Sequence, residues 1–568
     1  MGSLADWLDH RTGYRKLVSA ALDEEIAGGA RFAYVFGSAL LAIFTVQVAT
    51  GLLLMITYTP AVGGAWSSVV YIQQHVAGGW FVRGLHAYGA QAMVVVLGLH
   101  LLQVALYGAY RAPREVNWWF GLALLGIVQT MALTGYLLPW DQKGYWATKV
   151  ATNIAGTVPV VGPAIQTLVV GGVDYGQSTL TRFYALHVAV LPAALALMTV
   201  VHVALMRRHG ITPPHGADMQ KKGRFYPEQV AMDMLFSVLV IIVVAILTGI
   251  NHGMHLDAPA DPLADYPPRP EWYFLFLFQL LKYLPGSMEL VGTIILPGLA
   301  MGFLFVLPFL DRGETNAVGK RLHLLAPIAL GFIGIVALTV MSYQDDAADE
   351  GFQRARADSH VRAQRALQLA KQGIPPGGPL EMLRNDPMTR GKDLYDQYCL
   401  GCHTLGGEDQ EAPDHGGFGS RPWTLALMHD PQDKRFFGTT EIDEMKPMDE
   451  KVPPADRKAV AEFLFAEGRE PNDADVDAAL VAKGKDVFED KCMDCHLYGG
   501  DGAFVFEGPD MTGYASRWWI YRQILQPDAE DQYGELNEMP SFEGDLSEHD
   551  AKLIAAYLRR QRFEPLTK

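Results

Sequence analysis

Seven long apolar segments alternate with polar loops over the first 343 residues of this 568-residue chain. They lie near residues 32–58, 84–108, 117–138, 182–206, 230–250, 288–310 and 323–343. Each is long enough to form a helix that crosses roughly 30 Å of hydrocarbon. Half of all residues are hydrophobic, more than a soluble protein of this length needs. The pattern predicts an all-α protein built on a seven-span transmembrane helical bundle.

Basic residues gather in alternate loops, and this predicts the orientation of the bundle. They follow the second, fourth and sixth segments and also occupy the N-terminal region: Arg111, Arg114, Arg207, Arg208, Lys221, Lys222, Arg224, Arg312, Lys320, Arg321, Arg11, Arg15 and Lys16. With seven spans they all lie on one side, which is therefore the cytoplasmic side. The C-terminus then lies outside. Residues 1–30 lack the apolar run of a signal peptide and favour a short amphipathic helix on the membrane face.

The composition changes after the last apolar segment. Residues 345–568 hold 44 acidic and 26 basic residues, a formal charge of −18, whereas the whole chain carries −16. Such a surface could steer a basic partner, or it could be an ordinary solvated surface. A charged stretch with a helical pattern runs to about residue 373, and a Pro-Pro-Gly-Gly-Pro linker occupies residues 375–379. Residues 385–470 and 478–563 then repeat one small helical unit.

The four cysteines form two Cys-x-x-Cys-His motifs, one in each repeat. The first comprises Cys399, Cys402 and His403, and the second Cys492, Cys495 and His496. This is the attachment signature of c-type haem. A disulfide framework or a zinc site would not place histidine directly after the second cysteine in both copies. Because c-type haem is attached on the outer side of an energy-coupling membrane, the motifs agree with the orientation given by the basic loops.

Two of the apolar segments each contain two histidines. His86 and His100 lie in the second segment, and His187 and His202 in the fourth. Spacings of 14 and 15 residues separate each pair by roughly 20 Å along a helix and return both histidines to nearly one face. The two helices run in the same direction, so His86 can face His187 and His100 can face His202. We predict two bis-imidazole iron sites for b-type haem, one above the other.

Glycine pairs with the same spacing support these haem sites. Gly37 and Gly51 lie in the first segment, and Gly121 and Gly135 in the third; both spacings are 14 residues. Without a side chain, each glycine lets its helix approach a flat macrocycle closely. Arg83 and Arg182 precede the outer histidines by about one turn and could pair with haem propionates, although ordinary anchoring at the interface is the alternative.

These residues resemble cytochrome b of quinol–cytochrome c oxidoreductases, in the split form of cytochrome b6 plus subunit IV joined here in one chain. Besides the histidine spacings, the resemblance rests on ThrGlyTyrLeuLeuProTrpAspGlnLysGlyTyrTrpAla at 134–147, GlyGlnSerThrLeuThrArgPheTyrAlaLeuHis at 176–187 and ProGluTrpTyr at 270–273. The cytochrome b6 branch attaches an extra haem through a cysteine of the first span. Val35 stands at that place here, and no cysteine precedes Cys399. A covalently held extra haem is therefore not expected.

The resemblance also implies a quinol-oxidising pocket between the two long outer loops, residues 139–181 and 251–287. Glu271 of the Pro-Glu-Trp-Tyr motif would accept a proton from quinol, and Tyr136, Gly144 and Tyr273 would line the pocket. The alternative for Glu271 is a solvated loop acid. A quinone-reducing site is implied at the inner side, near His202, Arg207 and the first span.

The repeats resemble small class I cytochrome c domains. In these domains the motif histidine is one axial ligand of the iron and a downstream methionine is usually the other. Met539 in Met-Pro-Ser-Phe is the expected ligand of the second copy, and the alignment of the repeats places Met445 opposite it, with Met448 as an alternative. We therefore expect two haem b and two haem c.

The sequence predicts six parts. They are an amphipathic helix at 1–30, a four-helix haem bundle at 31–215, a three-helix part with the Pro-Glu-Trp-Tyr loop at 216–344, a linker at 345–384, and cytochrome c domains at 385–470 and 471–568.

The expected function is the core subunit of a bifurcating quinol–cytochrome c oxidoreductase in a bacterial cytoplasmic membrane, coupled to proton translocation. It would act as a homodimer with a separate Rieske iron–sulfur subunit, since all four cysteines belong to the haem motifs. The acceptor would be a soluble cytochrome, a copper protein or a terminal oxidase. One alternative is a one-way membrane anchor of a dehydrogenase or hydrogenase, which would lack Pro-Glu-Trp-Tyr and the glycine pairs. Another is a diheme electron-transfer partner of an oxidase, which would leave the seven spans unexplained.

Overall fold

The computed structural model describes residues 3–313, 315–407, 411–502 and 508–563, and residues 564–568 at the end of the expected second cytochrome c domain lie outside this part. The chain forms two compact units, Met1–Leu380 and Glu381–Lys568, and the boundary falls inside the expected linker. Nearly all regular structure in the described residues is helical. One short antiparallel pair joins β1 (Glu25–Ala27) to β2 (Lys222–Arg224). The all-α prediction is confirmed.

Seven helical segments in the described residues are long and apolar enough to cross a membrane, as the hydropathy pattern predicts. The uninterrupted spans are α3 (Val35–Met55), α5 (Gly79–Tyr107), α6 (Glu115–Leu137) and α14 (Leu322–Ala348). The fourth span joins α9 (Gln177–Ala185), η2 (Leu186–Val190) and α10 (Leu191–His209). The fifth joins η3 (Phe225–Gln229) to α11 (Val230–Ile250), and the sixth joins η6 (Val291–Ile295) to α13 (Leu296–Leu310). Several spans begin earlier or later than hydropathy alone indicates.

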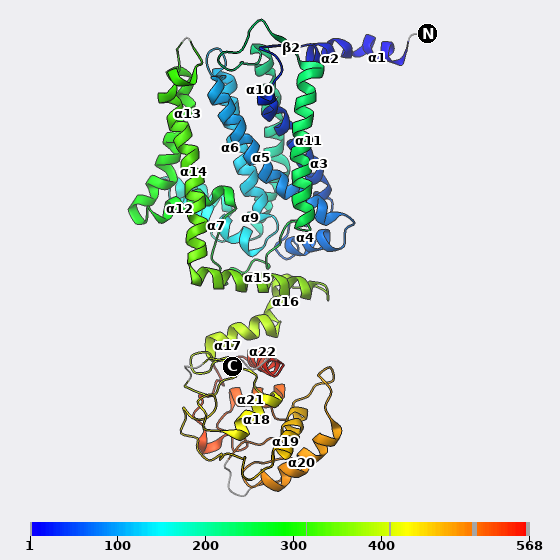
Figure 1. Cartoon of the computed structure of the whole chain (residues 1–568), viewed down its shortest axis with the longest axis vertical. Coiled ribbons are helices and arrows are strands. Elements are labelled where there is room, and N and C mark those ends of the chain that lie inside the picture. Colours follow the sequence, from blue (N-terminus) through cyan, green and yellow to red (C-terminus); the bar gives the residue numbers. More distant parts are fainter. Residues whose placement is uncertain (1–2, 314, 408–410, 503–507, 564–568) are drawn as a thin grey trace. The chain divides into compact units, whose positions relative to one another are not determined.

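The bundle expected to hold the b haems consists of the first four spans. α3 packs on α5, α10 packs on α6, and α11 covers α3 and α5 (Figure 1). A buried ion pair lies between the sixth and seventh spans: Arg321 Nε is 2.6 Å from Asp311 Oδ2. The Tyr110 hydroxyl donates to the same oxygen, and Arg321 donates to the Ala105 carbonyl, so these contacts join the later spans to the first four. Because both charges are paired and hydrogen-bonded, they can lie away from water.

Short helices close the two ends of the bundle. The N-terminal region forms two helices, α1 (Leu4–Thr12) and α2 (Tyr14–Leu22), where the sequence suggested one. The break occurs at Gly13, whose left-handed backbone (φ 63°) ends α1. The other short elements are η1 (Phe32–Tyr34), α4 (Ala65–Gln74), α7 (Gln142–Gly156), α8 (Gly162–Val170), η4 (Trp272–Phe274), α12 (Leu275–Lys282), η5 (Gly286–Met288) and η7 (Val318–Lys320). The charged stretch after the last span forms α15 (Glu350–Ala370), as its pattern predicts.

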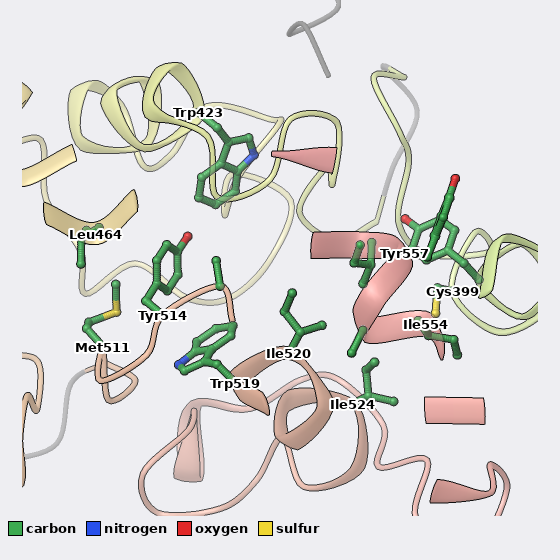
Figure 2. Close-up of a cluster of buried hydrophobic side chains, with 14 of the residues drawn as sticks. Cys399, Trp423, Leu464, Met511, Tyr514, Trp519, Ile520, Ile524, Ile554 and Tyr557 are labelled. Atoms are coloured by element: carbon green, nitrogen blue, oxygen red, sulfur yellow. The ribbon is translucent and has the colours of Figure 1, made fainter. Parts of the chain in front are cut away.

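The second unit contains both sequence repeats. The first copy comprises η8 (Pro387–Gly391), α17 (Lys392–Tyr398), α18 (Arg421–His429) and α19 (Pro454–Glu467), preceded by α16 (Pro379–Arg384). The second comprises α20 (Ala478–Lys491), α21 (Arg517–Leu525), η9 (Gly534–Leu536) and α22 (Glu548–Gln561). Side chains of both copies form one continuous apolar core, which includes Cys399, Trp423, Leu464, Trp519 and Tyr557 (Figure 2).

The two copies exchange their terminal helices. η8 and α17 of the first copy pack on α22 of the second, and α20 of the second copy packs on α19 of the first. The exchange is symmetric: Tyr395 and Tyr557 have ring centroids 5.6 Å apart, and the corresponding Phe488 and Phe463 are also 5.6 Å apart. Gly391 and Gly484 occupy corresponding close crossings, where the neighbouring backbone leaves no space for a Cβ. The repeats are therefore two copies in sequence but one body in packing.

Candidate haem and quinol sites

The first histidine pair lies between α5 and η2. The rings of His86 and His187 have centroids 6.2 Å apart. His187 Nδ1 lies 3.1 Å from the Met131 carbonyl oxygen, and His86 Nδ1 lies 3.0 Å from Thr50 Oγ1. When Nδ1 is engaged in this way, Nε2 is left to bind a metal. The structure thus brings the two predicted ligands together in a form that suits bis-imidazole ligation.

The second pair lies farther along the same helices. His100 of α5 and His202 of α10 both line a cavity of about 330 Å³. His202 Nδ1 lies 3.1 Å from the Asn117 carbonyl oxygen, whereas among the described residues His100 Nδ1 has no hydrogen-bond partner. A mainly apolar cavity lined by two imidazoles fits a haem b held by its iron.

Each of the four predicted glycines lies against one of the four histidines. A Cβ built on Gly51 would come within 3.2 Å of His86 Cε1, and one on Gly135 would overlap the His187 ring. The other two contacts are looser: a Cβ built on Gly37 would lie 3.6 Å from His100 Cε1, and one on Gly121 would lie 3.4 Å from His202 Cε1. The matched spacing of the glycines therefore reflects contact of their helices with the four histidines.

A local irregularity of the fourth span positions His187. Residues 186–190 form one π-helical turn, and Pro192 begins the α-helix that follows. Proline has no N–H, so it cannot donate to the carbonyl four residues earlier, and its ring displaces that turn. Insertions of this kind are frequent at functional sites. The wider turn explains why a spacing of 15 residues on this helix matches one of 14 on α5.

The Pro-Glu-Trp-Tyr motif begins a short helix at one end of the bundle. Glu271 is buried, and its Oε1 lies 2.8 Å from Lys143 Nζ. The same ammonium lies 5.6 Å from the centroid of the Tyr136 ring, whose hydroxyl has no partner among the described residues. Tyr273 is also buried, and burial raises the pKa of its hydroxyl. The predicted residues Glu271, Tyr136 and Tyr273 thus share one region, and Lys143 is a member that sequence reasoning missed, although it lies within the quoted motif.

Backbone contacts hold the two loops of this region together. Asp141 caps α7 by accepting from the Gly144 N–H at 2.8 Å, and it also accepts from the Asp257 N–H at 3.2 Å. Gly144 lies so close to the Tyr136 carbonyl that no Cβ would fit. Burial raises the pKa of both Asp141 and Asp257. From the linker helix α15, Ser359 donates to Asp257 Oδ1 at 3.3 Å, so that helix also covers the loop.

The two arginines proposed to bind propionates contact backbone carbonyls. Arg83 is buried and donates to the carbonyls of Met254 and His255 and to Gln73 Oε1. Arg182 donates to the Leu168 carbonyl. In this structure Arg83 fastens a loop to α5 and Arg182 joins α9 to α8, and their role toward propionates stays a prediction.

Polar groups collect at the opposite end of the bundle, around the second histidine pair. Arg207 Nη1 lies 3.4 Å from Glu24 Oε2, and its guanidinium lies over the Phe225 ring. Asp233 accepts from Ser38 Oγ at 2.7 Å. All these residues line the cavity that contains His100 and His202. The inner site implied by Arg207 therefore gains Glu24, Ser38 and Asp233, which the sequence did not single out.

The two cysteine motifs have the same local geometry. His403 Nδ1 lies 2.7 Å from the Pro413 carbonyl oxygen, and His496 Nδ1 lies 2.9 Å from the Pro509 carbonyl oxygen, so Nε2 of each ring can bind iron. Burial raises the pKa of the Cys399 thiol to about 12 and of the Cys492 thiol to about 11. All four cysteines are free of disulfides, as thioether attachment requires.

The expected methionine ligands are half-buried, and one further histidine lies beside the first motif. Met445 and Met448 both pack on the core of the second unit. Met539 N–H donates to Asn537 Oδ1 at 3.1 Å. His415 stacks on His403 with a centroid distance of 4.1 Å, and burial lowers the pKa of His415 well below its ordinary value. No spacing in the sequence indicated this contact.

Four helices around two stacked histidine pairs are the architecture of a membrane cytochrome b, with c-type motifs on an attached unit. The comparisons agree. Residues 22–210 match the family "Cytochrome b/b6/petB", residues 259–351 match "Cytochrome b(C-terminal)/b6/petD", and residues 386–464 and 479–558 match "Cytochrome C oxidase, cbb3-type, subunit III". The chain belongs to the cytochrome b family and carries cytochrome c repeats. It is a multi-pass membrane protein of electron transport, and these domains imply haem b and haem c.

Individual relatives cover the b part. The menaquinol:cytochrome c reductase cytochrome b subunit of Geobacillus thermodenitrificans is 40% identical over 222 residues, 38% of this chain and 99% of that protein. Cytochrome b6 of Gracilaria tenuistipitata var. liui is 39% identical over 214 residues, 38% of this chain and 100% of that protein. A solved structure titled "Hyperthermophilic respiratory Complex III" aligns with a TM-score of 0.53 and 26% identity, over 65% of this chain and 97% of that one.

Proposed function

We propose that this chain is the haem-carrying core of a bifurcating quinol–cytochrome c oxidoreductase. Quinol would be oxidised in the Glu271 pocket, with one electron leaving toward a Rieske protein and the c-type unit and the other crossing to the Arg207 end. The observation that carries the proposal is the Glu271–Lys143 pair of 2.8 Å beside the buried Tyr136, at the end of the bundle that holds His86 and His187. A proton acceptor and an electron acceptor thus lie at the same end of the bundle.

Two haem b, held by His86 with His187 and by His100 with His202, would supply the one-electron chemistry that connects the two ends of the bundle. Two haem c, held by Cys399, Cys402, Cys492 and Cys495, would supply the exit. Nδ1 contacts orient three of the four imidazoles, those of His86, His187 and His202, and the glycines keep α3 and α6 close to the rings. These four ligand sets support the proposed count of two haem b and two haem c.

The side chains of the Glu271 pocket would handle the protons. A carboxylate beside an ammonium can accept a quinol proton when Lys143 moves away to admit substrate, because the lost ion pair then favours the neutral acid. Tyr136 has an unpaired hydroxyl for a quinol oxygen. Asp141 and the Gly144 contact hold the first loop in place, and burial by both loops keeps bulk water from the acceptor.

The Arg207 end would reduce quinone. Arg207 paired with Glu24, together with Asp233, offers positive charge and proton-bearing groups beside the cavity of His100. Protons would be taken up on this cytoplasmic side and released on the opposite side of the membrane, at the Glu271 end. This orientation rests on the basic loops and on the outer location of c-haem attachment.

The proposed reaction also needs partner proteins. All four cysteines belong to the haem motifs, which supports a separate Rieske subunit as the source of the iron–sulfur centre. We propose a homodimer in a bacterial cytoplasmic membrane, with a soluble cytochrome, a copper protein or a terminal oxidase as acceptor.

The test is oxidant-induced reduction of haem b in the purified complex. An added oxidant should transiently reduce haem b during quinol oxidation, and an inhibitor of the Glu271 pocket should abolish that reduction. Glu271→Gln should slow quinol oxidation while both haem b remain, and Glu289→Gln, in the same half of the bundle, should not. If the inhibitor leaves oxidant-induced reduction unchanged, bifurcation in this chain is wrong.

A further inference from the structure

The helix exchange in the c-type unit raises the question of which methionine serves which haem. The chain of each copy crosses the other at corresponding points. A Cβ built on Gly419 would lie 2.7 Å from the Ala515 Cβ, and the rings of Phe418 and Tyr514 have centroids 5.9 Å apart. Gly419 and Ala515 both have left-handed backbone, with φ of 71° and 57°. The two haem-binding loops thus meet and turn at one place, directly before α18 and α21.

After the crossing, each copy's later helices stay together. α18 packs on α19, and α21 packs on α22. The methionine loops are fixed to the ends of α18 and α21 by equivalent bonds: Met448 N–H donates to the Met428 carbonyl at 2.9 Å, and Phe542 N–H donates to the Ile524 carbonyl at 3.2 Å. Each methionine loop therefore lies beside the C-terminal helix of its own copy. That helix, however, packs on the other copy's haem motif.

The region before each methionine lies where the copies meet. The Asp414 N–H still donates to the Arg435 carbonyl of its own copy at 2.8 Å. Farther along, the loops touch each other: Phe437 and Tyr533 rings are 6.5 Å apart, and the Glu441 N–H donates to Glu538 Oε1 at 2.6 Å. Met539 directly follows Glu538. The direction of the chain at this point therefore determines which haem motif the Met539 side chain can reach.

A single ring contact shows this direction. The Phe542 ring lies 6.1 Å from the ring of Tyr398, which directly precedes Cys399 of the first motif. Figure 2 shows Cys399 on the same side of the core as Tyr557 and Ile554 of α22, with Leu464 of α19 on the side of Met511 and Tyr514. The chain around Met539 therefore leads to the first haem motif and not back to His496.

We propose that the axial ligands of the c haems are exchanged between the copies. Met539 serves the haem of Cys399, Cys402 and His403, and Met445 serves the haem of Cys492, Cys495 and His496. Alignment of the repeats pairs each methionine with the motif of its own copy, so the geometry reverses the pairing that the sequence suggests. The inference rests on the two c haems of the proposed function, and its test first confirms them.

The experiment uses the full-length chain. One substitution makes the absorption band of one c haem distinguishable, and a second removes one of the two methionines. Cys399→Ala leaves the first haem attached through Cys402 alone; its retained vinyl group shifts that haem's α-band to longer wavelength, so the two c haems become distinguishable. Into this background Met539→Ala or Met445→Ala is introduced. Carbon monoxide is added to the reduced protein, because it binds only a haem that has lost its methionine.

The exchanged pairing predicts that Met539→Ala lets carbon monoxide shift most of the marked band and almost none of the unmarked one. Met445→Ala should do the reverse. The opposite assignment, or opening of both haems by either variant, overturns the proposal. If the Cys399→Ala chain does not incorporate haem, Cys492→Ala marks the second c haem instead. The exchanged pairing then predicts the same shifts with the marked and unmarked bands interchanged. A pyridine haemochrome count of two c haems in the unsubstituted chain is measured first, and a lower count contradicts the proposed function instead.

Discussion

At the scale of single residues, glycine positions give the sharpest test of the b-haem sites. Gly135 of α6 lies against the His187 ring, where no Cβ fits, whereas a Cβ at Gly126 of the same helix meets nothing within 4 Å. Gly135→Ala should displace the imidazole, remove most of one haem b, and cost about 1–3 kcal/mol through overpacking. Gly126→Ala should change neither. The measurement is the pyridine haemochrome ratio of b to c, and full b content in Gly135→Ala would contradict the assigned contact.

Glu462 provides a pH-dependent prediction in the c-type unit. This buried carboxylate of α19 pairs with Arg421 through Nη2 at 2.8 Å and accepts from the Asp477 N–H at 3.0 Å, contacts that lower its pKa. A lowered pKa means that the stabilisation is complete above the ordinary value near 4.5 and is lost as pH falls through the folded value. Glu462→Gln should therefore cost about 1–3 kcal/mol at neutral pH.

The measurement is thermal unfolding of the c-type unit in the full chain, followed by the c-haem Soret band. The difference in unfolding temperature between Glu462→Gln and the unsubstituted protein should shrink as pH falls below the ordinary pKa of glutamate, near 4.5. Glu489→Gln on α20 is the matched control, since Glu489 is exposed and lies 3.8 Å from Lys485. A difference that stays constant with pH would show that the cost arises from packing and not from charge.

At the scale of elements, we expect the cap of α7 to link helix stability to quinol oxidation. Asp141 holds the first turn of α7 and the loop that leads to Glu271 with one side chain. Asp141→Ala removes a cap contribution of about 1 kcal/mol and also frees the Asp257 N–H. We expect a raised KM for quinol and a lowered kcat, with normal haem content. Asp174→Ala, at an exposed position of the neighbouring loop, should leave steady-state kinetics unchanged. Equal effects of both variants would contradict a specific role of the Asp141 cap in quinol oxidation.

The elements also show what sequence can predict in such a protein. Hydropathy finds all seven spans because a helix in lipid must satisfy its backbone internally and cover it with apolar side chains. The glycine and histidine spacings predict their mutual contact because both follow from helix geometry. Local pattern does not find Lys143 beside Glu271, since the two residues are 128 positions apart and neither spacing nor composition joins them.

The helix exchange cannot be predicted from the sequence pattern, for a different reason. α19 and α22 share one pattern of apolar positions, and each presents apolar side chains to an N-terminal helix, so the pattern alone does not choose between the two partners. The choice depends on the turns near Gly419 and Ala515 and on the shared core, which only the folded chain shows. Residue identities predict the ligands, whereas the packing decides how they pair.

At the scale of the whole molecule, the uneven distribution of charge predicts which electron acceptors the c-type unit should reduce fastest. Residues 345–568 carry a formal charge of −18, whereas the membrane part is nearly neutral, so a basic acceptor approaches the c-type unit in an attractive field. Salt screens this field over about 8 Å at physiological ionic strength. We expect the rate constant for reduction of a basic soluble cytochrome c to fall steeply as salt rises, while that of an acidic copper protein stays flat or increases. Stopped-flow oxidation of the c haems measures both. A basic acceptor whose rate does not depend on salt would show that the acidic surface serves solubility alone, and that the acceptor is recognised by other contacts.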